Sequence, residues 1–377
     1  MADGTEIPQR IARLTPLADV LARVDALVKP VAPREVATNA AAGGVLAGDV
    51  SAVPRPSGPL ALRDGWAVRA ELTTDASSYA PAPLPAAARI DVGQPLPAGA
   101  DAVAPLEVVV ARAGRVEIIA PVAAGDGVLA AGADADGRTA LVREGRRLTH
   151  IQAAALAAAG VQRVRIREPR LRLIHMRPAG DEVIAAAVEL IAAEIAAAGG
   201  RVLREAQEDA GPGRLEHALA DTAADAIIAI GGTGSGRDDV SVRTLARLGR
   251  LEVHGIALAP GETAAFGLVG PRPVLLLPGR LDAALAVWLV IGRHLLARLS
   301  GVADERPATK ASLARKVAST LGFAEVVPVH LRDGAADPMG SGYLPLSALA
   351  QADGWLLVPA DSEGYPPGAE VVIRPWP

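Results

Sequence analysis

The pattern that most constrains the fold of this chain runs from about residue 171 to residue 302, where short apolar runs alternate with helical stretches. The runs "LRLIHM", "DAIIAIGG" and "PRPVLLLPG" are typical of strands that are buried on both faces. "DEVIAAAVELIAAEIAAAGG" lies between the first two runs and predicts a helix closed by a pair of glycines. Strands that alternate with helices favour a mostly parallel sheet with helices on both faces. We therefore expect a three-layer α/β domain over residues 171–302.

The segments on either side of this domain have a different character. Residues 49–140 are rich in proline, glycine and short runs such as "RVEIIAPV", which predicts a small β-domain. Residues 10–48 read as helical, with Thr15 as the N-cap and Pro16 in the first helical position. "LTHIQAAALAAAGVQRVRI" predicts another capped helix, followed by a strand. From about residue 303, "EVVPVHL", "GWLLVPA" and "AEVVIRP" predict a second β-domain.

Composition excludes several classes of function. The formal net charge is only −4 over 377 residues, and the absence of basic blocks argues against nucleic acid or an anionic membrane as a partner. The chain has no cysteine, which excludes disulfides and thiolate metal sites. No stretch approaches the roughly 20 uninterrupted apolar residues of a membrane span, and "MADGTEIPQRIARL" lacks the features of a signal peptide. We expect a cytoplasmic protein.

The loop after the predicted strand "DAIIAIGG" carries the clearest functional signal. It reads "IAIGGTGSGRDDVS" over residues 228–241, and its glycines allow the backbone to approach a ligand closely. Ligands of open α/β sheets bind beyond the carboxyl ends of the strands, where successive N–H groups form an anion-binding nest. No lysine follows the glycines, which excludes a nucleotide P-loop, and the dinucleotide spacing is also absent. On the glycines alone, a tight structural turn is the alternative.

The loop and several other segments resemble one family. "GGTGSGRDDVS" resembles the motif G-G-T-G-x-G-x-x-D-V-[ST] of molybdopterin-binding domains. Further similar segments are "LRDGWAVRA", "VGQPLPAGADAV", "RPAGDEV", "HGIALAPGETAAFG", "RPVLLLPGRLDAALAVW" and "GSGYLPLSALAQADGWLLVPADSEGYPPGAEVVI". They occur in the family's order across roughly residues 10 to 377, so the chain resembles the molybdopterin molybdenumtransferases, which include the C-terminal part of gephyrin.

This resemblance implies an elongated homodimer whose subunit combines α/β and β parts. The expected parts are a helical linker domain (10–48 plus 141–170), a small β-domain (49–140), a central α/β molybdopterin-binding domain with a mostly parallel sheet (171–302) and a C-terminal β-barrel (303–377). In this family the "DGY" segment of a neighbouring subunit, "DGW" here, completes the active site.

The resemblance also implies a reaction. It is the Mg²⁺-dependent hydrolysis of adenylylated molybdopterin, coupled to the insertion of molybdate into the dithiolene. The implied substrates are a small-molecule pterin and molybdate, and a molybdoenzyme or another cofactor-biosynthesis protein is the implied partner.

Site residues carry over position by position. The implied catalytic residues are Asp64, Asp134, Asp225 and Asp239, with Asp225 and Asp239 also as metal ligands. The implied cofactor-binding residues are Gly231, Gly232, Thr233, Gly234, Ser235, Gly236, Asp181, Glu182, Pro278, Gly279 and Ser341. Carboxylates suit Mg²⁺, which takes a few oxygen ligands and keeps several waters. For any single aspartate, an N-cap, a turn or a surface charge is the alternative.

Some positions depart from the family pattern. The family's "KPGKP" lysines are Ala259 and Glu262 here, and the threonine of "TGAPLP" is Val92. Arg280, or Arg237 in the glycine loop, is a candidate to restore one positive charge. These changes leave a second hypothesis open, a catalytically impaired cofactor-binding protein that acts as a carrier or maturation scaffold. A third, weaker one is an unrelated sugar-phosphate or nucleotide enzyme that uses the α/β domain alone.

Overall fold

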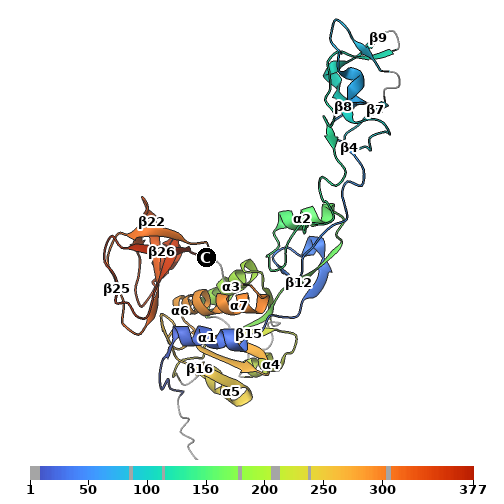
Figure 1. Ribbon diagram of the computed structural model, residues 1–377. Coiled ribbons are helices and arrows are strands. Elements are labelled where there is room, and N and C mark those ends of the chain that lie inside the picture. Colours follow the sequence, from blue (N-terminus) through green and yellow to red (C-terminus); the bar gives the residue numbers. More distant parts are fainter. Residues whose placement is uncertain are drawn as a thin grey trace, which may run out of the picture.

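The computed structural model describes residues 9–84, 88–112, 115–176, 181–204, 213–236, 239–302 and 307–377. Figure 1 shows an elongated molecule with four parts, which we call the α/β unit, the barrel, the linker unit and the distal unit. The barrel lies beside the α/β unit. The linker unit rises from the other side of the α/β unit and carries the distal unit far from it.

The α/β unit is built on a six-stranded sheet. Its order is β14 (Arg201–Arg204), β13 (Arg170–His175), β15 (Ala226–Ile230), β19 (Arg272–Leu277), β18 (Ala265–Val269) and β16 (Arg250–His254). The first four strands are parallel, whereas β18 and β16 pair antiparallel at one edge. The expectation of a mostly parallel sheet is confirmed.

Helices cover both faces of this sheet, because the apolar side chains of its strands point alternately to either side. Along β15, Ile228 and Ile230 join one hydrophobic core, and Ile227 and Ala229 join the other. The helices of the first face are α1 (Leu17–Leu27), α3 (Glu182–Ala197), α6 (Leu281–Val287), the π-turn η4 (Trp288–Gly292) and α7 (Arg293–Ser300). Those of the second face are α4 (Arg214–Ala220) and α5 (Ser241–Leu248). The three-layer architecture is confirmed.

The segment α6–η4–α7 is a core helix. Over Leu281–Ser300 it is long and apolar enough to cross a membrane by length and composition, but 83% of its most apolar window is buried inside the protein. Its apolar character is therefore explained by packing against the sheet and α3.

The linker unit combines two segments that are distant in sequence. Its sheet joins β2 (Arg34–Ala37), β12 (Arg163–Arg167) and β3 (Val45–Leu46), with the 3₁₀ turn η1 (Thr38–Ala40) after β2. Helix α2 (His150–Ala158) packs on this sheet. It begins with a capping box in which Thr149 and Gln152 exchange side-chain to backbone hydrogen bonds, as the expected capped helix requires.

Two expectations for the N-terminal segment are wrong. Thr15 is not a helix N-cap: Thr15–Pro16 form β1, whose Thr15 N–H donates to the Gly255 carbonyl at 2.9 Å. The helix begins at Leu17 instead. Between residues 10 and 48 only α1 is α-helical, since β2 and β3 are held by β12. Tertiary strand pairing overrides the local helical pattern in both cases.

The distal unit consists of short strands and turns. One sheet joins β7 (Ala88–Ile90), β5 (Gly65–Val68) and β8 (Ala102–Pro105), and another joins β6 (Ala82–Pro83), β10 (Arg115–Ile118) and β9 (Val109–Arg112). β4 (Leu60–Ala61) pairs with β11 (Val128–Leu129), and η2 (Ala70–Thr73) and η3 (Leu106–Val108) are 3₁₀ turns.

The C-terminal part is a closed five-stranded barrel. Its strands are β22 (Ala324–Arg332), β23 (Ala335–Pro338), β20 (Thr309–Leu313), β26 (Glu370–Pro375) and β24 (Gly354–Val358), and the pairing of β22 with β24 closes it. Helix α8 (Leu346–Gln351) and the pair β21 (Val317–Ala318) with β25 (Gly364–Tyr365) complete this part.

A strand from the α/β unit binds the barrel. β17 (Ile256–Ala259) does not join the six-stranded sheet but pairs with β22 on one side and β1 on the other. The segment that follows β17, with Glu262, therefore lies between the α/β unit and the barrel.

Candidate functional site

The glycine loop lies at the carboxyl edge of the parallel sheet, between β15 and α5. Gly231 and Gly232 have φ values of +95° and +72°, in the left-handed region that side chains disfavour. A Cβ on Gly232 would lie 2.3 Å from Ser241 Oγ, and that hydroxyl donates to the Gly231 carbonyl at 2.9 Å. Here glycine is required by the backbone conformation and by the close contact with α5.

Asp239 closes the far end of the loop. Its Oδ2 accepts a hydrogen bond from Gly236 N at 2.8 Å, and its own N–H donates to the Gly236 carbonyl at 3.2 Å. A Cβ on Gly234 would lie 2.7 Å from the same Oδ2, so the carboxylate also explains that glycine. Asp239 Oδ1 has no described hydrogen bond. Arg237, a candidate cation from the sequence, lies outside the described residues.

The start of the described chain fastens the loop from outside. Gln9, which is buried, donates through Nε2 to the carbonyls of Gly232 and Gly234 at 2.9 and 2.7 Å. On the inner side, Thr233 shares a 3.0 Å hydroxyl–hydroxyl hydrogen bond with Thr263. The loop is thus fixed on both sides before any ligand binds.

A cavity of about 340 Å³, which we call the glycine-loop cavity, opens beside this loop. Of the residues expected to bind the cofactor or act in catalysis, those that line it are Asp181, Gly232, Thr233, Gly234, Asp239, Pro278 and Gly279. Val183, Thr263 and Arg280 complete the lining. Seven expected positions from three separate segments therefore meet at one cavity. Gly231, Ser235 and Glu182 are sequence neighbours of its lining residues, and Gly236 donates a hydrogen bond to Asp239.

Helix termini make this cavity favourable for an anion. α3, α5 and α6 each follow a parallel strand, so their N-termini point to the carboxyl edge where the cavity lies. Unpaired N–H groups and the helix dipole favour negative charge at such termini. Asp181 already caps α3, because its Oδ1 accepts from Ile184 N at 3.2 Å.

Arg280 is the cation of the glycine-loop cavity among the described residues. Its side chain is 56% exposed and pairs with Asp282, which is 4% exposed and also accepts from Leu344 N at 3.1 Å. The guanidinium lies over the Tyr343 ring, 5.0 Å from its centroid. The hydrogen bonds that Arg280 donates to Asp282, and then the negative charges of Asp282 and Glu262, raise the pKa of Arg280. Arg280 is therefore a fixed positive charge that also joins the barrel to the site.

A second cavity, which we call the acidic cavity, lies between the α/β unit and the barrel and has a volume of about 380 Å³. Ala259 and Glu262, the positions of the family lysines, both line it, together with Ser341 and Glu325. Glu325 Oε1 accepts from Ser341 Oγ at 2.6 Å and from Gly342 N at 2.7 Å. Its described lining includes two glutamates and no lysine or arginine. Glu262 lines this cavity and Thr263 the other, so one loop separates the two.

Asp64 lies in the distal unit, far from the glycine loop of the same chain (Figure 1). Its Oδ1 accepts from Val92 N at 2.8 Å, so the "DGW" segment and the segment that lost the family threonine are adjacent. The neighbouring Trp66 packs on the distal core, and the Arg89 guanidinium lies 5.4 Å from the centroid of its ring. These contacts fit a packing role for Trp66 rather than stacking against a pterin.

Asp134 is exposed in the turn after β11, and its N–H donates to the Arg55 carbonyl at 3.0 Å. The carboxylate that organises this turn through hydrogen bonds is that of Asp136. It accepts from the backbone N–H groups of Arg138 and Thr139 and from the Thr139 hydroxyl. These hydrogen bonds, with the one from Thr139 N the largest cause, lower the pKa of Asp136 from 3.8 to about 2.

Asp225 is another expected site residue that the structure places away from the glycine loop. It precedes β15 at the amino edge of the sheet, roughly 17 Å of strand from the glycine loop. Its Oδ2 pairs with Arg34 of β2 at 2.8 Å and accepts from Arg170 N at 2.7 Å. The two residues expected as metal ligands, Asp225 and Asp239, therefore lie at opposite edges of the sheet in one subunit, and Asp225 connects the α/β unit to the linker unit through Arg34.

The residues present fit Mg²⁺ only together with a phosphate-bearing ligand. The described part of the chain holds no group of three or more His, Asp or Glu side chains arranged to bind a metal. Asp239 and Asp181 line one cavity, and each has one carboxylate oxygen without a described hydrogen bond. Mg²⁺ is commonly held by one or two carboxylates, waters and substrate phosphates.

Gln9, Thr263 and Val183 were not among the expected site residues. Gln9 carries no motif, and its contact bridges more than 220 residues of sequence. The only sequence signal for Thr263 is its position next to Glu262, which departs from the family pattern. The only signal for Val183 is its position after Asp181 and Glu182.

Family models match three consecutive parts of the chain. Residues 15–160 match the "MoeA N-terminal region (domain I and II)", residues 179–298 the "Probable molybdopterin binding domain", and residues 310–376 the "MoeA C-terminal region (domain IV)".

Individual relatives agree with these matches. Molybdopterin molybdenumtransferase 1 of Mycobacterium tuberculosis is 31% identical over 237 residues, 57% of this chain, and the chain spans about half (53%) of that relative. Molybdopterin molybdenumtransferase 2 of the same organism is 28% identical over 384 residues, covering 90% of this chain and 94% of the relative. The crystal structure of a MoeA molybdopterin biosynthesis protein from Pyrococcus horikoshii is similar with a TM-score of 0.74 and 27% identity, covering 97% of this chain and 100% of that one.

Proposed function

We propose a function from one premise: the chain belongs to the MoeA family of molybdenum cofactor biosynthesis proteins. The proposed activity is that of a molybdopterin molybdenumtransferase in the cytoplasm. It hydrolyses adenylylated molybdopterin with Mg²⁺ and inserts molybdate into the dithiolene. Relatives named as transferases favour this activity over a carrier or maturation scaffold.

The observation that carries the proposal is the glycine-loop cavity. It combines glycine N–H groups, helix N-termini and Arg280 at the carboxyl edge of a parallel sheet. This arrangement binds phosphate through backbone donors and a helix dipole rather than through a lysine. We assign the phosphate end of the pterin to Gly232 and Gly234, with Arg280 as the side-chain cation.

Asp239 has two roles in this proposal. Oδ2 holds the loop through Gly236, and Oδ1 of Asp239 together with Asp181 would hold a Mg²⁺ ion. A bound Mg²⁺ would neutralise charge that develops on the phosphate oxygens. The protein residues themselves position the phosphate and keep the loop fixed.

The acidic cavity is lined by the two positions at which the family has lysines, and we assign molybdate binding to this position in the family pattern. Glu262 and Glu325 repel a dianion there, and Arg280 is the described cation close enough to offset the charge of Glu262. We therefore propose that molybdate binds weakly and that adenylyl hydrolysis is the better preserved half-reaction.

A second copy of the chain completes the site in this proposal. Asp64 cannot reach the glycine loop of its own subunit, because the linker unit holds the two apart (Figure 1). A homodimer in which the distal unit of one subunit reaches the cavity of the other would bring Asp64 to the substrate. Isologous dimers of this kind contain two equivalent sites.

The test follows AMP release from adenylylated molybdopterin with Mg²⁺ and molybdate. The wild-type chain should release AMP, and Asp239→Asn should lower the rate by about 100-fold or more, the range for losing a group that positions the reacting phosphate. Asp361→Asn, an exposed aspartate of the barrel, is the matched control and should leave the rate unchanged. Tight pterin binding without AMP release by the wild-type chain would show a carrier instead.

A further inference from the structure

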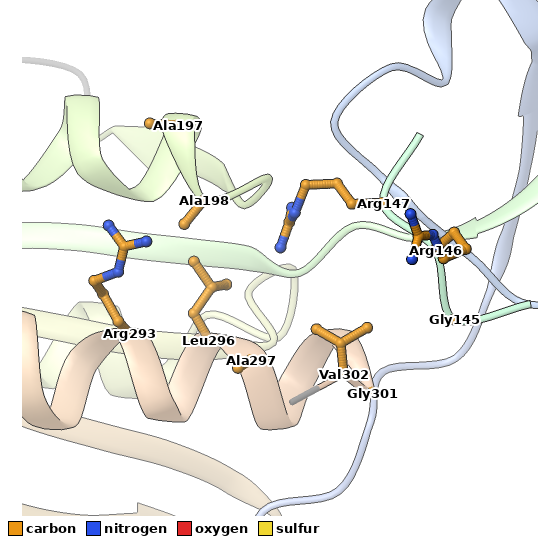
Figure 2. A pocket seen from close by; sticks show the side chains of 10 residues that line it. All are labelled: Gly145, Arg146, Arg147, Ala197, Ala198, Arg293, Leu296, Ala297, Gly301 and Val302. Carbon is orange, nitrogen blue, oxygen red and sulfur yellow. The ribbon is translucent and has the colours of Figure 1, made fainter. Parts of the chain in front are cut away.

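A third cavity lies where the linker unit meets the α/β unit, away from the glycine loop (Figure 2). Its volume is about 420 Å³, and its lining includes Arg146, Arg147, Arg293, Ala198, Leu296 and Gly301. Arg146 and Arg147 belong to the linker unit, and Arg293 begins α7 of the α/β unit. Cations from two units therefore face one space.

Arg147 enters this cavity without a carboxylate partner among the described residues. Figure 2 shows its guanidinium extending toward the α3 and α7 side. Nη1 donates to the Gly43 carbonyl at 2.7 Å, and Gly199 leaves room for it, because a Cβ there would collide with Nη1. Burial, and then the charge of Arg293, lower the pKa of Arg147. A half-buried cation close to a second cation is unfavourable unless an anion accompanies them.

Arg293 is only partly paired. Its Nη1 donates to Glu194 Oε2 at 3.0 Å, whereas its Nε is buried and has no hydrogen-bond partner in the structure. Three arginines against one glutamate leave a formal charge of +2 on these groups. A buried N–H without an acceptor is unfavourable, so the described residues satisfy Arg293 only in part.

Capping of helix ends offers an ordinary explanation for arginines here, because α3 and α7 end near the cavity. The described hydrogen bonds do not fit it. Arg147 donates to Gly43 in the linker unit, and Arg293 donates to a side chain of α3 rather than to a terminal carbonyl. Both guanidinium groups therefore have N–H groups that donate to no described residue and can donate to a bound ligand.

We propose that this cavity binds a tetrahedral oxyanion, phosphate or a phosphomonoester group, between Arg147 of the linker unit and Arg293 of the α/β unit. Guanidinium groups present several N–H donors in a planar fork that matches phosphate oxygens. The bound anion would join the two units and so restrict the orientation of the arm that carries the distal unit. This site is separate from the glycine-loop cavity and does not depend on the function proposed above.

Calorimetric titration of the full-length protein with inorganic phosphate and, separately, AMP tests the proposal in phosphate-free buffer. We expect one saturable Arg147-dependent site per chain, apart from any binding at the glycine-loop cavity, and binding at this site should weaken at least 10-fold in Arg147→Gln. Arg163→Gln is the matched control, since Arg163 is an exposed linker arginine paired with Glu35, and it should bind as the wild type does. Arg147-dependent binding of phosphate alone assigns a free oxyanion, and tighter Arg147-dependent binding of AMP assigns a phosphomonoester.

Thermal unfolding provides the second measurement. Phosphate should raise the unfolding temperature of the wild type and of Arg163→Gln more than that of Arg147→Gln. Arg146→Gln changes an exposed residue of the same cavity and should weaken binding even if Arg147→Gln does not fold. No saturable binding up to about 10 mM phosphate or AMP, or equal binding by Arg147→Gln, Arg146→Gln and the wild type, would overturn the proposal.

Discussion

In the proposed reaction, the charge at residue 262 decides how readily an oxyanion binds next to the barrel. Glu262 and the buried Glu325 face the same cavity, and Ala259 contributes no charge. The departure from the family lysines was visible in the sequence. The structure adds that Glu325 is engaged by Ser341 and Gly342, so Glu262 is the more readily changed of the two glutamates.

Glu262→Lys should therefore improve the use of molybdate. Replacing repulsion by attraction at a partly exposed site gives about a 10-fold lower KM for molybdate, or about 1.4 kcal/mol. Pterin binding at the glycine-loop cavity should change little. Steady-state molybdenum insertion at varied molybdate measures this, with Glu363→Lys in the β24–β25 turn as a charge-matched control. An unchanged KM would mean that molybdate does not enter the acidic cavity.

Substitutions at Asp134 and Asp136 should change different properties of the protein, AMP release in the first case and stability in the second. Asp136→Asn removes hydrogen bonds that hold the turn and should lower the unfolding temperature, whereas Asp134→Asn should lower AMP release without affecting unfolding. The folded pKa of Asp136 lies below its ordinary value, so its contribution to stability is present above about pH 4 and is lost as the pH falls toward 2. Carboxyl NMR titration and thermal unfolding at several pH values check both statements.

At the scale of elements, the proposed phosphate site depends on the unit formed by β15, the glycine loop and α5. The apolar run before the glycines and the serine after them predict this unit from local sequence alone. The observed φ of Gly232 and its contact with Ser241 show why a side chain is excluded there.

Gly232→Ala should impair pterin binding. A left-handed φ costs a non-glycine residue about 1–2 kcal/mol, and the new Cβ would also displace Ser241. We expect at least 10-fold weaker binding of molybdopterin in a fluorescence titration. Gly48→Ala is the control, because a Cβ added at Gly48 would meet no atom within 4 Å and the backbone there needs no positive φ. Equal binding by the two variants would place the pterin elsewhere.

Elements whose partners are far away in sequence could not be predicted in this way. Thr15 and Pro16 fit an N-cap locally, but β1 pairs with β17, and β17 in turn pairs with the barrel. Gln9 reaches the loop only because that pairing brings the N-terminal segment there. Asp225 matches its family position, yet the amino edge of the sheet and the partner Arg34 follow only from the assembled fold.

At the scale of the whole molecule, the three-layer unit follows from a pattern of local sequence, because apolar runs that alternate with helical stretches predict a parallel sheet covered on both faces. For residues 303–377 the local pattern predicts only a β-domain, and the barrel was implied by the family resemblance. The distance between the distal unit and the glycine loop does not follow from any local pattern. Because of that distance, the proposed reaction requires a dimer.

Subunit mixing tests the central claim most directly. Asp64→Asn and Asp239→Asn homodimers should each release AMP at least 100-fold more slowly than the wild type, since each lacks one group that positions the substrate. After exchange of subunits, half of the dimers are mixed and each has one intact site, so the mixture should recover about a quarter of the wild-type rate. The account predicts this recovery. Undiminished activity of either variant alone, or no recovery once mixed dimers have formed, would contradict it.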